Sequence, residues 1–206
     1  MPEPLSLKII VASTRPSRLA DAVAPWVARR AGEHGAFDVE VLDLRDWPLP
    51  FFQETVETIG DLADPTYTEP VVARWNRTIV EGDAFLVVTP EYSHSIPGAL
   101  KNAIDSVFVS WGFRNKPVAA VGYSVGVAAG TRAIEHLAQI MIEVEAVPLR
   151  NSVILAKAHE GFGEDGAPLD PGSEAALAVV LDDLAWWAGV LRDARPTQLP
   201  PAVLRG

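Results

Sequence analysis

The feature that most constrains the fold is a repeated alternation of short apolar runs with helical patterns. Three runs are apolar at almost every position, at residues 7–12, 84–89 and 117–122. Such runs are typical of strands that are covered on both faces, as the strands of parallel sheets are. The segments between them carry apolar residues at helical spacing. Strands that alternate with helices predict an α/β fold, a mainly parallel sheet with helices on both faces.

Five strands and five helices are expected from this alternation. The strands are predicted at residues 7–12, 37–44, 84–89, 117–122 and 147–155. The helices are predicted at residues 19–33, 70–80, 96–109, 131–144 and 173–191, with Pro97 in the first turn of the third and Ser173 as the N-cap of the last. Residues 46–70 form a long predicted loop with room for one helical turn. We expect a single domain over residues 1–195 and a C-terminal tail over residues 196–206.

Composition narrows the classes of function. The chain of 206 residues is 49% apolar and has a formal net charge of −10, which argues against a nucleic-acid partner. It contains no cysteine, so disulfides and thiolate nucleophiles are excluded, and any redox chemistry needs a bound cofactor. The four histidines include no pair at metal-ligand spacing, so no metal site is expected.

The same composition bears on location. No apolar run reaches the ~18 residues of a membrane-spanning helix, so no membrane partner is expected. The first residues, Met1, Pro2, Glu3 and Pro4, lack the basic and apolar regions of a signal peptide. The expected location is therefore the cytoplasm.

The turn after the first predicted strand concentrates hydroxyl and guanidinium groups. It contains Ser13, Thr14, Arg15, Ser17 and Arg18, directly before a predicted helix. A helix N-terminus offers free N–H groups and partial positive charge, hydroxyls add donors, and arginine matches the geometry of a phosphate. The turn therefore predicts a site for a phosphate monoester. The alternative is an ordinary strand-to-helix turn in which the hydroxyls act as N-caps.

Two further loops follow buried strands, and in a parallel sheet they reach the same edge as the first turn. The first holds Pro90, Glu91, Tyr92 and Ser93, and the second holds Tyr123, Ser124 and Gly126. Pro90 stiffens its loop, Tyr92 supplies an aromatic surface, and Gly122 and Gly126 allow the backbone to approach a flat ring. Because the first turn contains no glycine and no P-loop lysine, the common dinucleotide and nucleoside triphosphate loops are excluded.

A longer motif identifies a resemblance. Residues 89–105 read T-P-E-Y-S-H-S-I-P-G-A-L-K-N-A-I-D, and the first turn reads S-T-R-P-S-R. These segments resemble the NADPH-dependent FMN reductase family, and the resemblance covers roughly residues 5–155. The family has a flavodoxin-like fold with strand order 2-1-3-4-5. The chain departs from the family pattern at Ala12, where glycine is usual, and at Ser93, where asparagine is frequent.

The resemblance implies an FMN-dependent NAD(P)H oxidoreductase. The phosphate of FMN would be held by Ser13, Thr14, Arg15, Ser17 and Arg18. Its ring would be held by Pro90, Glu91, Tyr92, Ser93, Tyr123, Ser124 and Gly126. No side chain is assigned a catalytic role, because the chemistry would take place at N5 of FMN. Hydride from NADPH or NADH would pass to a flavin, quinone, azo or nitro compound, or metal ion, in a ping-pong cycle. Relatives form homodimers or homotetramers, and the same is expected here.

Two alternatives remain open on the sequence. One is a flavodoxin-like electron carrier without enzymatic turnover, against which the arginine-bearing first turn argues. The other is a flavin-sensing binding module in which FMN occupancy governs the binding of a partner. Reduction of bound flavin by NADPH or NADH distinguishes an enzyme from both. His94 is expected to have no chemical role.

Overall fold

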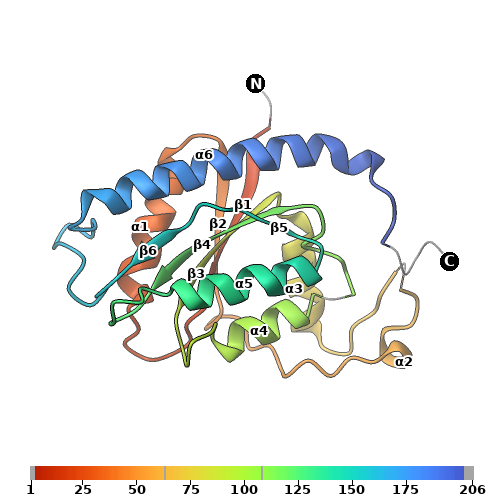
Figure 1. The fold of residues 1–206 in the computed structure, drawn as a ribbon. Helices are drawn as coiled ribbons and strands as arrows, with labels where there is room; N and C mark the ends of the chain where they lie inside the picture. Colours follow the sequence, from red (N-terminus) through yellow and green to blue (C-terminus); the bar gives the residue numbers. More distant parts are fainter. Residues whose placement is uncertain (1–2, 63, 108, 202–206) are drawn as a thin grey trace.

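The computed structural model describes residues 3–62, 64–107 and 109–201, and these residues contain one parallel β-sheet covered by helices (Figure 1). The strands are β1 (Leu5–Val11), β2 (Phe37–Asp43), β3 (Ala84–Pro90), β4 (Pro117–Tyr123), β5 (Val147–Pro148) and β6 (Val153–Leu155). The helices are α1 (Ala20–Glu33), α2 (Val56–Ile59), α3 (Pro70–Glu81), α4 (Gly98–Asp105), α5 (Thr131–Glu143) and α6 (Pro171–Ala194), followed by the 3₁₀ turn η1 (Arg195–Thr197).

The sheet has the predicted topology. Its strand order is β2-β1-β3-β4-β5, these strands pair in parallel, and β6 also pairs in parallel with β4. In this register Ile9 of β1 lies opposite Val41 of β2 and Leu86 of β3. The flavodoxin-like α/β fold expected from the sequence is therefore confirmed.

Two apolar cores lie on the two faces of the sheet. Helices α1 and α6 cover one face, where Trp26 and Leu184 are fully buried. Helices α3, α4 and α5 cover the other, where Trp75 and Leu100 are fully buried (Figure 1). Every residue of β3 and β4 is buried, because each strand places successive side chains into alternate cores. The continuous apolar runs in the sequence have this physical origin.

The prediction of one continuous fifth strand was wrong. The segment is divided into β5 and β6, and both pair with β4. Leu149 still donates its N–H to the Val118 carbonyl at 2.8 Å. After it, the Asn151 side chain bonds Asp183 of α6 at 2.7 Å, which draws the polar residues between the two strands toward the helix.

Four predicted helix boundaries were also wrong, at both ends of α6 and both ends of α4. Helix α6 begins at Pro171, with Asp170 and not Ser173 as its N-cap, since Asp170 Oδ1 accepts from Gly172 N at 2.9 Å. Pro171 occupies the first helical position, where its fixed φ suits a helix and its missing N–H costs nothing. The same helix continues to Ala194, beyond the predicted end. Helix α4 is shorter than predicted: Pro97 is its N-cap and it ends at Asp105. Position 108 of the predicted helix lies outside the described residues.

The topology places a crevice at one edge of the sheet. After β1 the chain enters α1 on one face, and after the neighbouring β3 it enters α4 on the opposite face. The loops that leave these two strands therefore diverge beyond their carboxyl ends. In open α/β sheets this divergence is where ligands bind. The long loop between β2 and α3 contains the short helix α2.

Candidate cofactor site

The β1–α1 turn is tied to the loop after β3 by a pair of hydroxyls. Ser13 is fully buried, and its Oγ lies 2.7 Å from Oη of Tyr92. Helix α1 begins only at Ala20, and its N-cap, Leu19, makes no side-chain cap bond. The exposed hydroxyls of Thr14 and Ser17 therefore do not cap α1, so the capping alternative is not seen. Those two hydroxyls are free to face a ligand.

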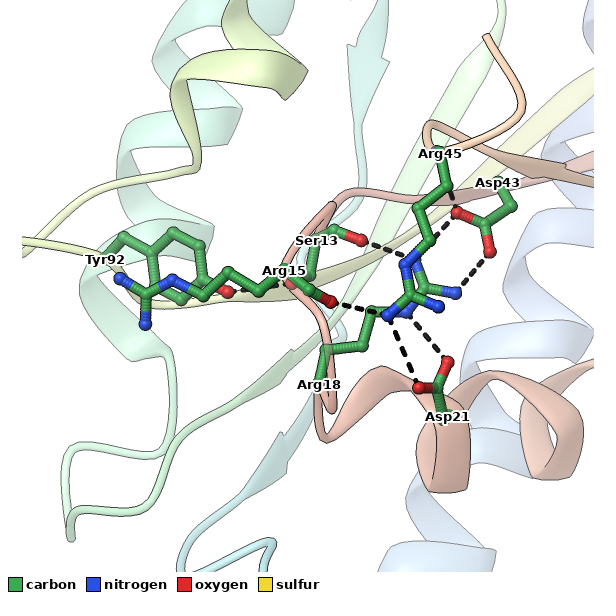
Figure 2. A network of polar contacts seen from close by, with 7 residues as sticks. All are labelled: Ser13, Arg15, Arg18, Asp21, Asp43, Arg45 and Tyr92. Carbon is green, nitrogen blue, oxygen red and sulfur yellow. Dashed lines mark hydrogen bonds and ion pairs between the residues drawn. The ribbon is translucent and has the colours of Figure 1, made fainter.

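Arg18 is held by carboxylates of the protein itself (Figure 2). Its guanidinium makes a two-pronged pair with Asp43 at the end of β2, and its Nε donates to Asp21 at 2.9 Å. The hydrogen bond that Arg18 donates to Asp43 is the main cause that raises the pKa of Arg18, although burial opposes it. Burial alone would raise the pKa of Asp43, but hydrogen bonds from Arg18 and from the Arg45 backbone hold it below its usual value. The positive charge of Arg18 is thus already neutralised by the carboxylates of Asp43 and Asp21.

Arg15 has a different environment. Its guanidinium lies over the ring of Tyr92, 4.1 Å from the ring centroid, while its backbone carbonyl accepts from Arg45 (Figure 2). In the part of the chain that the structure describes, no carboxylate pairs with the Arg15 side chain. A cation–π contact at an exposed site contributes only about 0.5–1 kcal/mol, so it can be exchanged for an anion. Arg15 is therefore the cation of this turn that is available to a phosphate.

The loop after β3 makes a tight turn. Tyr92 and Ser95 exchange backbone hydrogen bonds at 2.9 and 3.0 Å, and the two central residues, Ser93 and His94, have φ of 50° and 65°. Positive φ at both central positions is the geometry of a type I′ turn. Glu91, at the start of the turn, has a nearly buried carboxylate that pairs with Arg132 of α5 at 2.6 Å. The turn is thus fastened to α5.

The third loop packs closely against the end of β4. Ser124 Oγ accepts from Gly126 N at 3.2 Å, which closes a small turn. Gly122 does not face open space: an added Cβ would lie 2.7 Å from Ile134 Cδ1 of α5. Gly122 therefore allows β4 and α5 to pack closely. A Cβ added to Gly126, in contrast, would have its nearest neighbour 3.9 Å away.

The three loops enclose a cavity of about 340 Å³. This volume falls in the range of small-molecule sites. Eight of the twelve predicted site residues line it: Arg15, Ser17, Arg18, Pro90, Glu91, Tyr92, Tyr123 and Ser124. The other four, Ser13, Thr14, Ser93 and Gly126, lie in the same loops but not on its wall. Sequence reasoning missed Pro16, Leu19 and Val125, for which adjacency to predicted residues was the one available signal.

A buried hydroxyl beside this cavity makes no hydrogen bond of regular geometry among the described residues. It belongs to Tyr123, which is 2% exposed, and the Ser13 hydroxyl next to its Oη is already bonded to Tyr92. Burial is the main cause that raises the pKa of Tyr123, so the hydroxyl stays protonated and can donate. An unpaired buried donor costs free energy, which a ligand acceptor would recover. With Arg15, it gives the cavity the donors that a phosphorylated, flat cofactor needs, so the residues present fit FMN.

Two other cavities are larger, but neither lies at the carboxyl edge of the sheet. One of about 510 Å³ lies between α4 and α5, and one of about 520 Å³ lies beside α3. Among the described residues, no group of three or more metal-ligating side chains is assembled. No helix in the described ranges is long and apolar enough to cross a membrane.

Known proteins that are similar to this chain include reductases that are named for FMN, in agreement with the fit of the cavity residues to FMN. Residues 6–160 match the NADPH-dependent FMN reductase family. An NAD(P)H-dependent FMN reductase of Schizosaccharomyces pombe is 35% identical over 115 residues, which span 56% of each chain. A 2-hydroxy-1,4-benzoquinone reductase of Burkholderia is 28% identical over 93% of this chain and 98% of its own.

A solved structure agrees in both fold and sequence. The flavoenzyme NAD(P)H:(acceptor) oxidoreductase FerB of Paracoccus denitrificans superimposes with a TM-score of 0.72 and 26% identity, covering 90% of this chain and 97% of that one. The family match extends over most of the chain, including all three loops of the cavity. The protein therefore belongs to the NADPH-dependent FMN reductase family, with FMN as its cofactor and NAD(P)H as its reductant.

Proposed function

We propose that the cavity at the carboxyl ends of β1, β3 and β4 is the FMN site of this reductase. One observation carries the proposal. At the switch point of the sheet, the cavity wall carries Arg15, which has no carboxylate partner in the described chain, and Tyr123, whose buried hydroxyl makes no hydrogen bond of regular geometry there. Both groups can donate to a ligand.

The residues of the β1–α1 turn have different roles in binding the phosphate: some contact it, and others hold the turn in place. Arg15 supplies the charge, and the exposed hydroxyls of Thr14 and Ser17 supply further donors. Arg18 acts indirectly, because its pairs with Asp43 and Asp21 hold the turn against β2 and α1. Ser13 orients Tyr92 through the 2.7 Å hydroxyl contact. The turn is therefore arranged before the cofactor arrives.

The other two loops hold the flavin ring. Bound FMN supplies the hydride-accepting and electron-donating centre of the reaction. The turn at residues 92–95 and the loop at residues 123–126 would offer backbone groups to the polar edge of the ring, while the Tyr123 hydroxyl lies beside Ser13 of the β1–α1 turn. Donors placed there would stabilise negative charge that develops on reduction. No side-chain acid is needed for this role.

We infer a ping-pong cycle in which oxidised nicotinamide leaves before the second acceptor enters. The cavity of about 340 Å³ is small for two ligands beside a flavin, so the two substrates would use one open face in turn. A quinone is the favoured class of acceptor, since the Burkholderia relative is named as a benzoquinone reductase. Flavins, azo and nitro compounds and metal ions are the other acceptors to be tested. The expected location of the protein remains the cytoplasm.

We also infer a homo-oligomer, a dimer or tetramer. The support is an apolar hollow of about 510 Å³ between α4 and α5, whose wall includes Phe52, Ile104 and Ile140. Phe51, next to it in sequence, is 89% exposed. Sedimentation velocity of the protein and of Ile140→Glu tests this inference. A wild-type protein that sediments as a monomer at tens of micromolar would overturn it.

The decisive experiment for the site is flavin binding together with anaerobic reduction. FMN-loaded protein should lose its flavin absorbance when NADPH or NADH is added, and a quinone should restore it. Arg15→Ala should weaken the binding of FMN about tenfold or more. The binding of riboflavin should stay nearly unchanged, because riboflavin lacks the phosphate. Arg74→Ala is the matched control, because Arg74 also stacks on an aromatic ring, that of Trp47, but does not line the cavity.

Two results would count against the proposal. Equal weakening of FMN and riboflavin by Arg15→Ala would place the phosphate elsewhere. Bound flavin that neither nucleotide reduces would favour an electron carrier or a flavin-sensing module over an enzyme.

A further inference from the structure

The turn at residues 92–95 is held by a set of contacts with α5 that the proposed chemistry does not use. Glu91 Oε1 pairs with Arg132 Nη2 at 2.6 Å, and Glu91 Oε2 accepts from the backbone N–H of Arg132 at 3.3 Å. Arg132 is the second residue of α5, so this carboxylate also satisfies a free N–H at the helix N-terminus. One face of the Arg132 guanidinium is thereby committed to Glu91.

The other end of the same guanidinium meets His94. Arg132 Nη1 lies 2.9 Å from Nε2 of His94. An arginine side chain can only donate, so Nε2 of His94 must accept, and the imidazole proton must lie on Nδ1. This contact requires the neutral imidazole. A protonated imidazole has no acceptor left and would repel the guanidinium.

His94 occupies the position in the turn where such a contact matters. Its φ is 65° and that of Ser93 is 50°, although both positions of a type I′ turn favour asparagine or glycine. Left-handed backbone at residues with a side chain costs free energy, so the surroundings must hold it. Within the described residues, the bond from Arg132 is the hydrogen bond that holds the His94 side chain.

A neighbouring histidine provides an internal comparison. His136, one turn further along α5, places its Nδ1 3.0 Å from Ser95 Oγ. A serine hydroxyl can donate or accept, so this bond survives protonation of His136. The charged and titratable groups that face His94 in the described residues are thus Arg132 and, behind it, Glu91, while His136 faces the end of the turn.

We propose that His94 is a proton-sensitive positioning residue: its neutral imidazole, bonded to Arg132, holds the turn in the conformation that the flavin ring needs, and protonation releases the turn. This inference rests on the proposed location of the flavin ring. The turn then has lower affinity for the flavin on the acidic side.

The first test needs no cofactor. Amide hydrogen exchange of residues 92–95 is measured in the full-length protein at about pH 8 and about pH 5.5, on either side of the ordinary imidazole titration, and expressed as protection relative to intrinsic rates. Protection of the turn should fall at the lower pH in wild type and in His136→Gln. It should stay constant in His94→Gln, because the Gln Oε1 accepts from Arg132 at both values. The ¹⁵N shifts of His94 at the higher pH should report the Nδ1–H tautomer.

The second test uses riboflavin in place of FMN. Riboflavin has no phosphate, so titration of a phosphate cannot contribute to the pH dependence of its binding. Riboflavin affinity should be roughly threefold to tenfold weaker at the lower pH in wild type and in His136→Gln, as expected for one exposed charge-assisted hydrogen bond. In His94→Gln the affinity should not change with pH. Arg132→Lys should weaken riboflavin binding at both pH values. A lysine ammonium does not reproduce the planar guanidinium that bonds Glu91 and His94 at the same time.

The outcomes separate this inference from the proposed site. Turn protection that still falls in His94→Gln, or an Nε2–H tautomer, would overturn the role of His94. A wild-type protein that binds neither flavin would overturn the site, while the exchange measurement would still decide whether His94 controls the turn.

Discussion

Two arginines three residues apart show how the same residue type takes different roles. Arg18 has a nearly buried side chain that pairs with two carboxylates, whereas Arg15 is exposed and stacks on Tyr92. Their charges suggested one function for both, the binding of phosphate. The structure shows that Arg18 meets Asp43, which lies 25 positions away in sequence. No local pattern contains that partner, because it depends on the pairing of β1 with β2.

The first prediction concerns Arg18→Ala. The substitution leaves the half-buried Asp43 carboxylate without its main partner and should lower the free energy of unfolding by about 1–3 kcal/mol, the range for hydrogen bonds to charged groups. Urea unfolding at neutral pH measures the change. Arg45→Ala removes a more exposed arginine of the same network and should cost less than about 0.5 kcal/mol. Equal losses in the two variants would contradict the structural role given to Arg18.

At the scale of elements, the site depends on how closely α5 approaches the end of β4. Gly130, the N-cap of α5, has φ of 88°, and a Cβ there would lie 2.6 Å from Tyr123 N. Glycine permits both this backbone conformation and this contact. The approach places Arg132 beside Glu91 and positions Tyr123 at the cavity. A short packing distance between two elements thus sets the geometry of two loops.

The second prediction is that Gly130→Ala destabilises the protein and impairs flavin binding together. Strain at a positive φ and the clash with β4 should cost at least about 2 kcal/mol. Gly35→Ala is the matched control, because Gly35 also has a positive φ, of 81°, but an added Cβ there has no neighbour within 4 Å, and the residue does not line the cavity. Thermal unfolding and riboflavin titration of both variants measure the two effects. If Gly130→Ala behaves like Gly35→Ala, the close approach of α5 does not constrain the site.

At the scale of the whole molecule, a buried lysine joins parts that are distant in sequence. Lys116, just before β4, is 5% exposed and donates to the carbonyls of Ile79 and Val80 at the end of α3, at 3.1 and 2.6 Å. Burial is the main cause that lowers the pKa of Lys116, to about 7, and the nearby Arg195 lowers it further. Arg195 follows α6, so this charge cluster links α3, β4 and the C-terminal end of the last helix.

The third prediction is a dependence of stability on pH. Below about pH 7 Lys116 is protonated in both states, and the cost of burying its charge is fully present. Between that value and the ordinary lysine pKa the unfolded chain binds more protons, so the free energy of unfolding should rise with pH, by up to about 1.4 kcal/mol per pH unit. Chemical unfolding between pH 7 and pH 10 in roughly unit steps measures the slope. Lys116→Met should reduce it, and an unchanged slope would show that other groups cause the dependence.

The fold class and the three loops of the site could be predicted from the order of the amino acids. Strands buried on both faces must be apolar almost throughout, so the runs that became β1, β3 and β4 were visible without a structure. The ligand-binding edge follows from a parallel sheet, and eight of the twelve predicted residues line one cavity. Element ends were less predictable: the division of the fifth strand depends on the bond from Asn151 to Asp183, which are 32 positions apart.

Which of these polar groups can meet a ligand became clear from the folded chain alone. Sequence spacing could not show that Arg18 is neutralised by Asp43, that the Tyr123 hydroxyl is buried beside the Ser13 hydroxyl, or that His94 accepts from Arg132. Each fact depends on a contact between elements that are not neighbours in the chain. Charge and hydrogen-bonding capacity are properties of a residue, but their availability to a ligand is set by what the fold places beside it.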